Sequence, residues 1–228
     1  MVECLTISWL KNKNSDDIAP DFTVDSTAGK LNLHEWIGDS YAILFSHPKD
    51  FTPVCTTEFG AVARLVPEFA KRNTKVMGVS VDSVEEHVKW LRDIEAFSGS
   101  PADFPIIDDT SLEVSKLYDM LPAGAYLPES RTAANSATVR TVFIIGPDKK
   151  VRLTMSYPMS VGRNFAEIMR ALDAIQITDG VAIATPADWV PGEDVIVALS
   201  LNDEQAKKEF GDLDIKLPYL RFAKAPAK

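Results

Sequence analysis

Cys55 is the residue of this chain with the clearest capacity for chemistry. It is one of two cysteines among 228 residues, and no cysteine follows it. It lies in the segment Pro48-Lys49-Asp50-Phe51-Thr52-Pro53-Val54-Cys55-Thr56-Thr57-Glu58. A thiol acts as a nucleophile in its ionised form, so its surroundings decide its reactivity. The alternative is a small buried apolar side chain, which is the usual role of a free cysteine.

The elements around Cys55 favour a reactive thiol. The apolar run Tyr41-Ala42-Ile43-Leu44-Phe45-Ser46 predicts a buried strand, and Pro48 and Pro53 bracket an irregular loop. From Thr57 onward, apolar residues recur every three or four positions, which predicts an amphipathic helix. We therefore expect Cys55 on or just before the first turn of a helix. Unpaired N–H groups and the positive end of the helix dipole stabilise an anion there.

Two residues just before Cys55 suit a substrate that brings an oxygen atom close to the sulfur. The Thr52 hydroxyl can donate a hydrogen bond to a substrate oxygen, or accept one from it. Pro53 narrows the approach to the sulfur and brings no competing N–H donor. Both residue types therefore favour a substrate site beside the thiol.

This segment resembles the signature of the peroxiredoxins, which are thiol peroxidases. The spacing Pro48-x-x-x-Thr52-x-x-Cys55 carries the resemblance, and the longer run from Ser46 to Glu58 is similar to the one-cysteine subgroup. Further matching segments follow in order: Pro105 to Asp109, Arg140 to Phe143, Gly146 to Lys150, Tyr157-Pro158, Gly162 to Phe165 and Ala184 to Trp189. The resemblance covers nearly the whole chain from about Ile18 onward.

The resemblance implies an α/β chain with a thioredoxin-like fold, a central mixed sheet flanked by helices, and a small C-terminal α+β domain. We expect an N-terminal extension over residues 1–13, a peroxidase domain over 14–178 and a dimerisation-type domain over 179–228, with the boundary at Thr178-Asp179-Gly180. The expected elements are a strand at 75–81, a helix capped by Ser83 with Val84, Val88, Leu91 and Ile94 on one side, a hairpin over 142–157, a helix capped by Asn164 and a helix near 202–210.

The resemblance also implies a mechanism. The Cys55 thiolate would attack hydrogen peroxide or an organic or lipid hydroperoxide, with Thr52 and Arg140 holding the peroxide oxygens and Pro48 and Pro53 shaping the site. Cys55 would become a sulfenic acid, which an external thiol, glutathione or a thioredoxin-type protein, would reduce. On sequence alone, Arg140 could instead be a surface strand residue in an ion pair.

Further residues receive supporting roles from the same resemblance. His47 would lie near the sulfur and position solvent or the entering thiol, although a structural imidazole is the alternative. Glu58 and Arg163 would brace Arg140 in an ion network. Cys4 belongs to the extension before the matched region, and an inert terminal thiol is its simplest interpretation.

Some one-cysteine peroxiredoxins are also phospholipases of the A2 type, and the matching residues here are Ser40, His34 and Asp148. The turn before the strand, however, has Ala42 where a nucleophile elbow has its last glycine. Two further functional classes are a thioredoxin-fold chaperone or redox relay without peroxide chemistry, and a disulfide oxidoreductase. The first would be marked by loss of Thr52, Cys55 or Arg140, and the second needs a Cys-x-x-Cys motif that this chain lacks.

Composition narrows the remaining classes. The net charge of −9 argues against a nucleic-acid partner bound through its phosphates. No apolar run has the roughly 20 residues of a membrane span. The three histidines and two cysteines show no metal-ligand spacing, so we expect neither a metal nor another cofactor. A free thiol suits a reducing compartment, and we expect a cytoplasmic homodimer.

Overall fold

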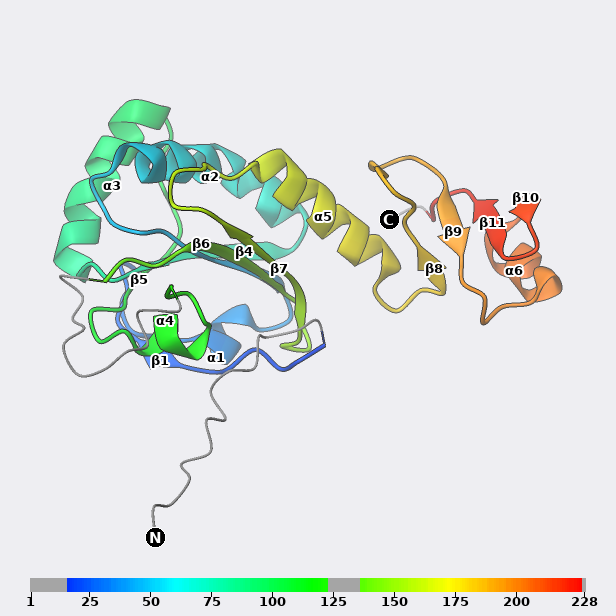
Figure 1. The fold of residues 1–228 in the computed structure, drawn as a ribbon, viewed down its shortest axis with the longest axis horizontal. Coiled ribbons are helices and arrows are strands. Elements are labelled where there is room, and N and C mark those ends of the chain that lie inside the picture. Colours follow the sequence, from blue (N-terminus) through cyan, green and yellow to red (C-terminus); the bar gives the residue numbers. More distant parts are fainter. Residues whose placement is uncertain (1–15, 123–135, 227–228) are drawn as a thin grey trace, which may run out of the picture. The chain divides into compact units, whose positions relative to one another are not determined.

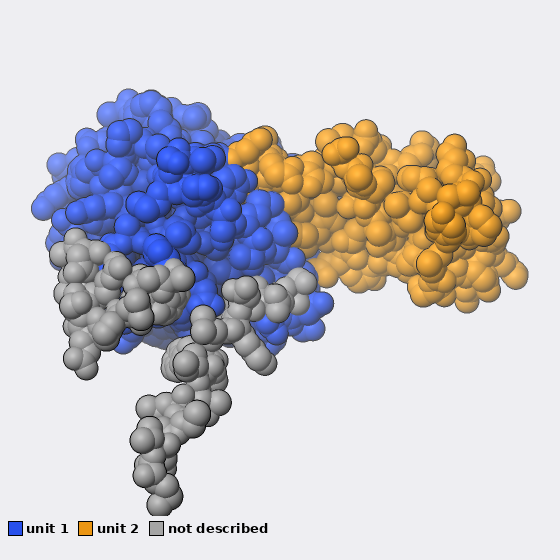
Figure 2. Space-filling view, viewed as in Figure 1, with its two compact units in different colours: residues 1–163 blue, residues 164–228 orange. Residues whose placement is uncertain are grey.

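The computed structural model describes residues 16–122 and 136–226. Contacts divide the chain into two compact units, residues 1–163 and residues 164–228, which Figure 2 shows in blue and orange. Cys4 and the expected extension over residues 1–13 lie outside the described residues.

A five-stranded mixed sheet forms the centre of the first unit, with the order β5-β4-β3-β6-β7. The strands are β3 (Tyr41–Ser46), β4 (Thr74–Ser80), β5 (Ile106–Asp108), β6 (Arg140–Ile145) and β7 (Val151–Tyr157). Strands β3, β4 and β5 run parallel, whereas β6 is antiparallel to both β3 and β7. The expected hairpin is therefore β6 and β7, and Arg140 begins an interior strand.

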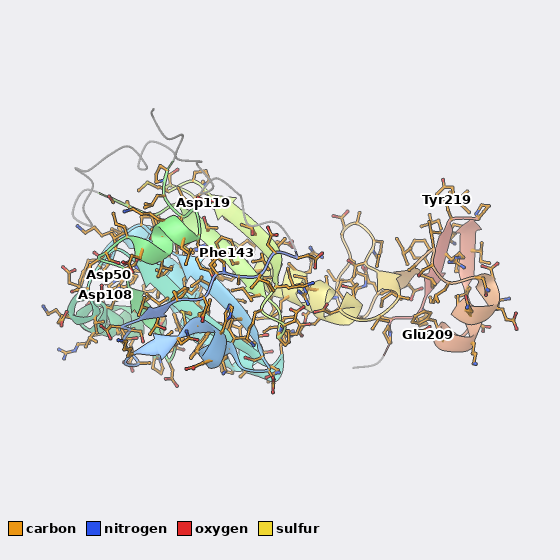
Figure 3. All side chains as sticks on the ribbon, turned by 90° about the horizontal axis from the view of Figure 1, so that it is seen from below. Asp50, Asp108, Asp119, Phe143, Glu209 and Tyr219 are labelled. Atoms are coloured by element: carbon orange, nitrogen blue, oxygen red, sulfur yellow. The ribbon has the colours of Figure 1, made fainter. Side chains whose placement is uncertain are left out.

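Helices lie on both faces of this sheet, as expected. They are α1 (Leu33–Ile37), α2 (Pro53–Lys71), α3 (Val84–Ser98) and α4 (Glu113–Leu117), and a small separate sheet pairs β1 (Thr23–Val24) with β2 (Leu31–Asn32). Figure 1 shows α2 and α3 on one side of the sheet and α1 and α4 on the other. Leu33 of α1, Tyr118 after α4 and Phe143 of β6, labelled in Figure 3, share one buried core.

Helix α3 begins as predicted but turns a different face inward. Ser83 accepts from the Glu86 N–H and the Glu86 carboxylate accepts from the Ser83 N–H, which completes the expected capping box. The buried residues of the helix are His87, Trp90 and Ile94. Val88 is 44% exposed, and Ile94 is the only one of the four apolar residues expected at helical steps that is buried. The helix itself was predicted correctly. The apolar residues considered from the sequence, Val88 among them, did not reveal that His87 is buried.

The second unit contains α5 (Phe165–Thr178), α6 (Asp203–Phe210) and a four-stranded antiparallel sheet of β8 (Ile183–Ala184), β9 (Val195–Val197), β10 (Asp214–Leu217) and β11 (Leu220–Ala223). Asn164 caps α5 and Asn202 caps α6. Tyr219, labelled in Figure 3, lies 64% exposed between β10 and β11.

Helix α5 groups with this second unit, so the division of contacts falls before the boundary that we expected at residue 178. The reason is packing: Ala174 and Ile177 on the last turns of α5 share a core with Ile183, Trp189 and Val195.

Candidate active site

Cys55 occupies the first turn of α2, where the sequence placed it. Thr52 is the N-cap residue, Pro53 is the first helical residue, and Cys55 is the third. The first intrahelical bond runs from the Thr56 N–H to the Thr52 carbonyl, at 3.0 Å. The N–H groups of Val54 and Cys55 therefore have no acceptor within the helix and belong to the same first turn as the thiol. The Cys55 side chain is fully buried, so water screens the partial positive charge of these N–H groups only weakly.

Arg140 supplies a positive charge at the sulfur. Its Nη1 atom lies 3.4 Å from Cys55 Sγ, and its Nε atom donates to the Met159 carbonyl at 2.8 Å. The residue is 3% exposed, so the alternative of a surface strand residue is wrong. A guanidinium at this distance stabilises a thiolate more than a thiol.

Glu58 holds Arg140 together with a second arginine. Its Oε2 atom accepts from Arg140 Nη1 at 2.7 Å and from Arg163 Nη2 at 2.6 Å. Its Oε1 atom accepts from Arg163 Nε at 2.9 Å and from the Arg163 N–H at 2.8 Å. Arg163 Nη1 also donates to the Ser46 carbonyl at 2.8 Å, and its guanidinium lies over the Phe45 ring. Glu58 therefore sets the position of both guanidinium groups.

Two guanidiniums and one carboxylate make up the described part of this network. Both buried arginines share the Glu58 carboxylate, and Arg140 also lies against Cys55. Burial lowers the pKa of Arg163 and the nearby Arg140 acts in the same direction, while Glu58 and Cys55 oppose this shift. A thiolate at Cys55 would add a second negative charge beside the two guanidiniums.

The Thr52 hydroxyl is already engaged as a donor. Its Oγ1 atom donates to the Lys49 carbonyl at 2.9 Å and does not cap the helix. Its oxygen lone pairs can then accept a hydrogen bond from the O–H of a bound hydroperoxide. Phe51, just before it, has a φ of 55°, in a left-handed region that is unfavourable for a bulky residue. Pro48 is buried in the loop before them, and Pro53 is exposed at the helix start.

His47 is completely buried between aromatic rings. It stacks on Trp90 at 5.0 Å and meets Phe59 edge-on at 4.6 Å, and Phe59 lies one helical turn after Cys55. Its Nε2 atom is 2.7 Å from Asp50 Oδ1. Burial lowers the pKa of His47 and outweighs the opposing effect of Asp50, so the ring is neutral.

Sequence reasoning missed two partners of His47, namely Asp50 and His87. Asp50 Oδ2 lies 2.7 Å from His87 Nδ1, and His87 Nε2 lies 3.0 Å from the Ile107 carbonyl. The spacing of His47 and Asp50 could have indicated the first contact. Nothing local indicated the second, because His87 belongs to a helix that the fold brings to this loop.

His47, Asp50 and His87 also form a group whose candidate metal-ligand atoms lie within 4.8 Å of one another. The expectation that no metal-ligand set exists was based on spacing along the chain, which does not reveal this cluster. The two 2.7 Å contacts within it are hydrogen bonds, and a metal would have to replace both.

The three residues considered for a phospholipase do not contact one another through any hydrogen bond in the described part of the chain. Ser40 Oγ donates to the Ile37 carbonyl at 2.5 Å, and His34 Nε2 lies 2.7 Å from the Ala19 carbonyl. Asp148 pairs with Arg152 at 3.1 Å. Each side chain therefore has a local structural partner.

Comparison with known proteins identifies the family. The family model "AhpC/TSA family" matches residues 16–154, and the model "C-terminal domain of 1-Cys peroxiredoxin" matches residues 174–213. The chain belongs to the one-cysteine peroxiredoxins. It is therefore a thiol-dependent peroxidase of the peroxiredoxin fold, as the sequence indicated.

Individual peroxiredoxins agree with this assignment. The mitochondrial peroxiredoxin PRX1 of Saccharomyces cerevisiae is 48% identical over 93% of this chain and 80% of its own length. Peroxiredoxin-6 of Mus musculus is 47% identical over 92% of this chain and 96% of its own length. A solved yeast mitochondrial 1-Cys peroxiredoxin has a TM-score of 0.84 and 47% identity, covering 92% of this chain and 99% of that one. Within residues 16–122 and 136–226 of this peroxiredoxin, no helix has the length and apolar character of a bilayer crossing.

Proposed function

We propose that Cys55 is the peroxidatic nucleophile and that Arg140 is the residue that activates it. The contact of Arg140 Nη1 with Cys55 Sγ, at 3.4 Å, is the observation that carries this proposal. It joins the single cysteine of the described chain to a buried network in which two guanidiniums share the Glu58 carboxylate. A cation fixed at this point favours an anionic nucleophile.

The reaction follows from this arrangement. The Cys55 thiolate attacks the terminal oxygen of the hydroperoxide, so that an S–O bond forms while the O–O bond breaks. The leaving oxygen takes the electron pair and a proton and departs as water or an alcohol, and Cys55 becomes a sulfenic acid. Arg140 and the N–H groups of Val54 and Cys55 stabilise the developing charge, and Thr52 accepts a hydrogen bond from the peroxide. Hydrogen peroxide and organic or lipid hydroperoxides are the proposed substrates.

An external thiol completes the cycle. It attacks the Cys55 sulfenic acid and releases water to form a mixed disulfide, which a second thiol then reduces. The absence of a cysteine after Cys55 supports this route. The solved yeast relative is described with a thiol-resolving mechanism via glutathione and thioredoxin systems, which supports these two reductant classes.

Mass spectrometry of the intact protein tests the proposal. One equivalent of hydrogen peroxide should add one oxygen, located on the Cys55 peptide. Glutathione added next should replace that oxygen by a glutathione adduct and then restore the reduced mass. An unchanged mass for Cys55, with peroxide still consumed, would contradict the proposed nucleophile.

We also propose a homodimer in the cytoplasm, from the family resemblance. The mitochondrial yeast relative gives the competing location. Light scattering on the purified chain and fluorescence microscopy of a tagged copy in its host would decide these two points.

A further inference from the structure

A second buried polar cluster adjoins the site and has no part in the arginine network. It consists of His47 and Asp50 in the loop after β3, and His87 on α3. We propose that Asp50 and His87 are positioning residues that hold His47 in the tautomer with hydrogen on Nε2, so that Nδ1 presents a lone pair. This inference rests on the proposed peroxidase function and on the role near the sulfur that the family resemblance implies for His47.

The hydrogen-bond partners assign the protons. The two ring nitrogens of His87 face acceptors only, a carboxylate oxygen of Asp50 at 2.7 Å and the Ile107 carbonyl at 3.0 Å. Both nitrogens must therefore carry hydrogen, which makes His87 an imidazolium. The other Asp50 oxygen faces His47 Nε2 at 2.7 Å. That oxygen can only accept, so the hydrogen of the neutral His47 ring lies on Nε2.

The charges of the surrounding groups agree with this assignment. Burial opposes the charged form of His87, but its hydrogen bond and attraction to Asp50 raise its pKa overall. Burial lowers the pKa of His47, and the nearby positive charge of His87 contributes to that shift against Asp50 and Asp82. Asp82 accepts from the Asp50 N–H and from Ser80 Oγ, each at 2.8 Å, and is the other ionisable group facing this cluster. Asp50 and His87 thus neutralise each other and leave His47 uncharged.

Packing fixes the ring that bears this lone pair. Trp90 and Phe59 confine the His47 ring, and Trp90 is itself held by a 3.1 Å bond from its Nε1 atom to Thr56 on α2. His47 Nδ1 is buried and has no hydrogen-bond partner among the residues that the structure describes. A buried acceptor without a donor is costly, so an atom of this kind calls for an explanation, and a catalytic role is one. A peroxide, a sulfenic acid or an entering thiol could each supply the missing hydrogen.

Nitrogen NMR of the reduced, full-length, ¹⁵N-histidine-labelled protein tests the proton assignment directly. The chain has three histidines, and a His34→Asn sample identifies the signal of the third. We expect His87 to show two protonated nitrogens near neutral pH and His47 to show hydrogen on Nε2 alone. Hydrogen on Nδ1 of His47, or a neutral His87, would overturn the proposal. Elemental analysis belongs to the same test, because a stoichiometric bound metal would make these nitrogens ligands instead.

A His87→Gln variant tests the consequence for catalysis. The glutamine amide keeps a donor toward Asp50 but removes the cation, so His47 should become the charged partner and accept a proton at Nδ1. Peroxide reduction should then fall at least about tenfold below neutral pH and recover as pH rises, unlike wild type. Lys89→Gln, an exposed change on the same helix, should keep the wild-type profile.

The outcomes separate this inference from the proposed function. An unchanged pH profile and an unchanged His47 signal in folded His87→Gln would overturn the positioning role. A wild-type rate for His47→Gln, with the NMR assignment intact, would instead refute the part of His47 in peroxide reduction. Should His87→Gln fail to fold, the wild-type spectrum still decides the tautomer.

Discussion

At the scale of single residues, the charge around Cys55 decides its reactivity. A free thiol is only a few per cent ionised at pH 7. Each tenfold gain in ionisation requires about 1.4 kcal/mol of preference for the anion. A helix N-terminus contributes about 1 kcal/mol, or about 2 kcal/mol when partly buried. The Arg140 guanidinium, at 3.4 Å from the sulfur, is the group that can supply the rest.

Arg140→Met should slow peroxide reduction by at least about tenfold, because losing about 1.4 kcal/mol of transition-state stabilisation costs one decade in rate. It should also lower the thiolate fraction of Cys55 at neutral pH. Stopped-flow kinetics and the pH dependence of alkylation measure both effects. Arg152→Met, on strand β7, is the matched control and should react like wild type. A wild-type rate and alkylation profile for Arg140→Met would remove its assigned role.

Glu58→Gln should destabilise the protein by about 3 kcal/mol, because it removes the buried carboxylate that both guanidiniums share. Glu58 is 3% exposed and accepts from both arginines, so water cannot replace it easily. Urea denaturation of the reduced protein measures the free energy of unfolding. Glu68→Gln changes an exposed carboxylate on the same helix and should leave the free energy of unfolding close to that of wild type. Equal stabilities of the two variants would contradict the bracing role.

At the scale of elements, Asp50 ties the loop after β3 to helix α3, and this tie should depend on pH. Burial opposes the charged form of Asp50, but hydrogen bonds from His47 and His87 lower its pKa overall. The folding stability that Asp50 contributes is therefore fully present above about pH 3.8 and is lost as the pH falls. The pKa of His87 is raised above 6.5, so its contribution exists below pH 6.5 and is lost as pH rises.

The stability lost in Asp50→Asn should therefore be largest between these two limits, at about 3 kcal/mol, and should shrink on either side. Urea denaturation at a series of pH values measures this difference from wild type. Asp108→Asn is the control, because it also removes a carboxylate that contacts α3, through the Val84 N–H. The stability lost in this variant should not shrink as the pH rises above 6.5. A difference that grows above pH 6.5 would have the wrong sign for a charged His87.

Ser40 lies in the turn before β3 and was a candidate residue for a phospholipase activity. Ser40→Ala should leave peroxidase turnover nearly unchanged, because Ser40 Oγ donates to the Ile37 carbonyl and takes no part in the proposed peroxide site. The loss of this bond should cost about 1 kcal/mol of stability. Peroxidase kinetics and release of fatty acid from a phospholipid are the two measurements. If wild type hydrolyses the acyl ester and Ser40→Ala does not, Ser40 serves a phospholipase despite the alanine at position 42.

At the scale of the whole molecule, the lack of a later cysteine determines how the enzyme is recycled. Cys55 sulfenic acid should persist until an external thiol reduces it, and excess peroxide without reductant should add two or three oxygens to the Cys55 peptide. Cys4→Ser should keep turnover with a small thiol, which an assay with limiting peroxide measures. A Cys4–Cys55 disulfide as the main product, together with loss of turnover in Cys4→Ser, would refute the one-cysteine mechanism.

The sequence by itself determined the family and the order of the main elements, and it singled out Cys55 as the nucleophile that we propose. These features are local: the signature from Pro48 to Cys55, the capping residues Ser83 and Asn164, and the hairpin after Arg140 are each encoded in a few neighbouring residues. Hydrogen bonds and steric preferences that act over one or two turns explain why short patterns suffice for them.

Tertiary structure alone decided the partners of His47. His87 is 37 positions from Asp50, yet the two share a buried hydrogen bond. The sequence indicated the apolar residues of α3, among them Val88, whereas packing buried His87 and Trp90 and left Val88 exposed. The reason is physical: a helical period fixes which residues share a face, but the face that turns inward depends on what the neighbouring elements offer it. For His87 on α3, that partner is the Asp50 carboxylate in the loop after β3.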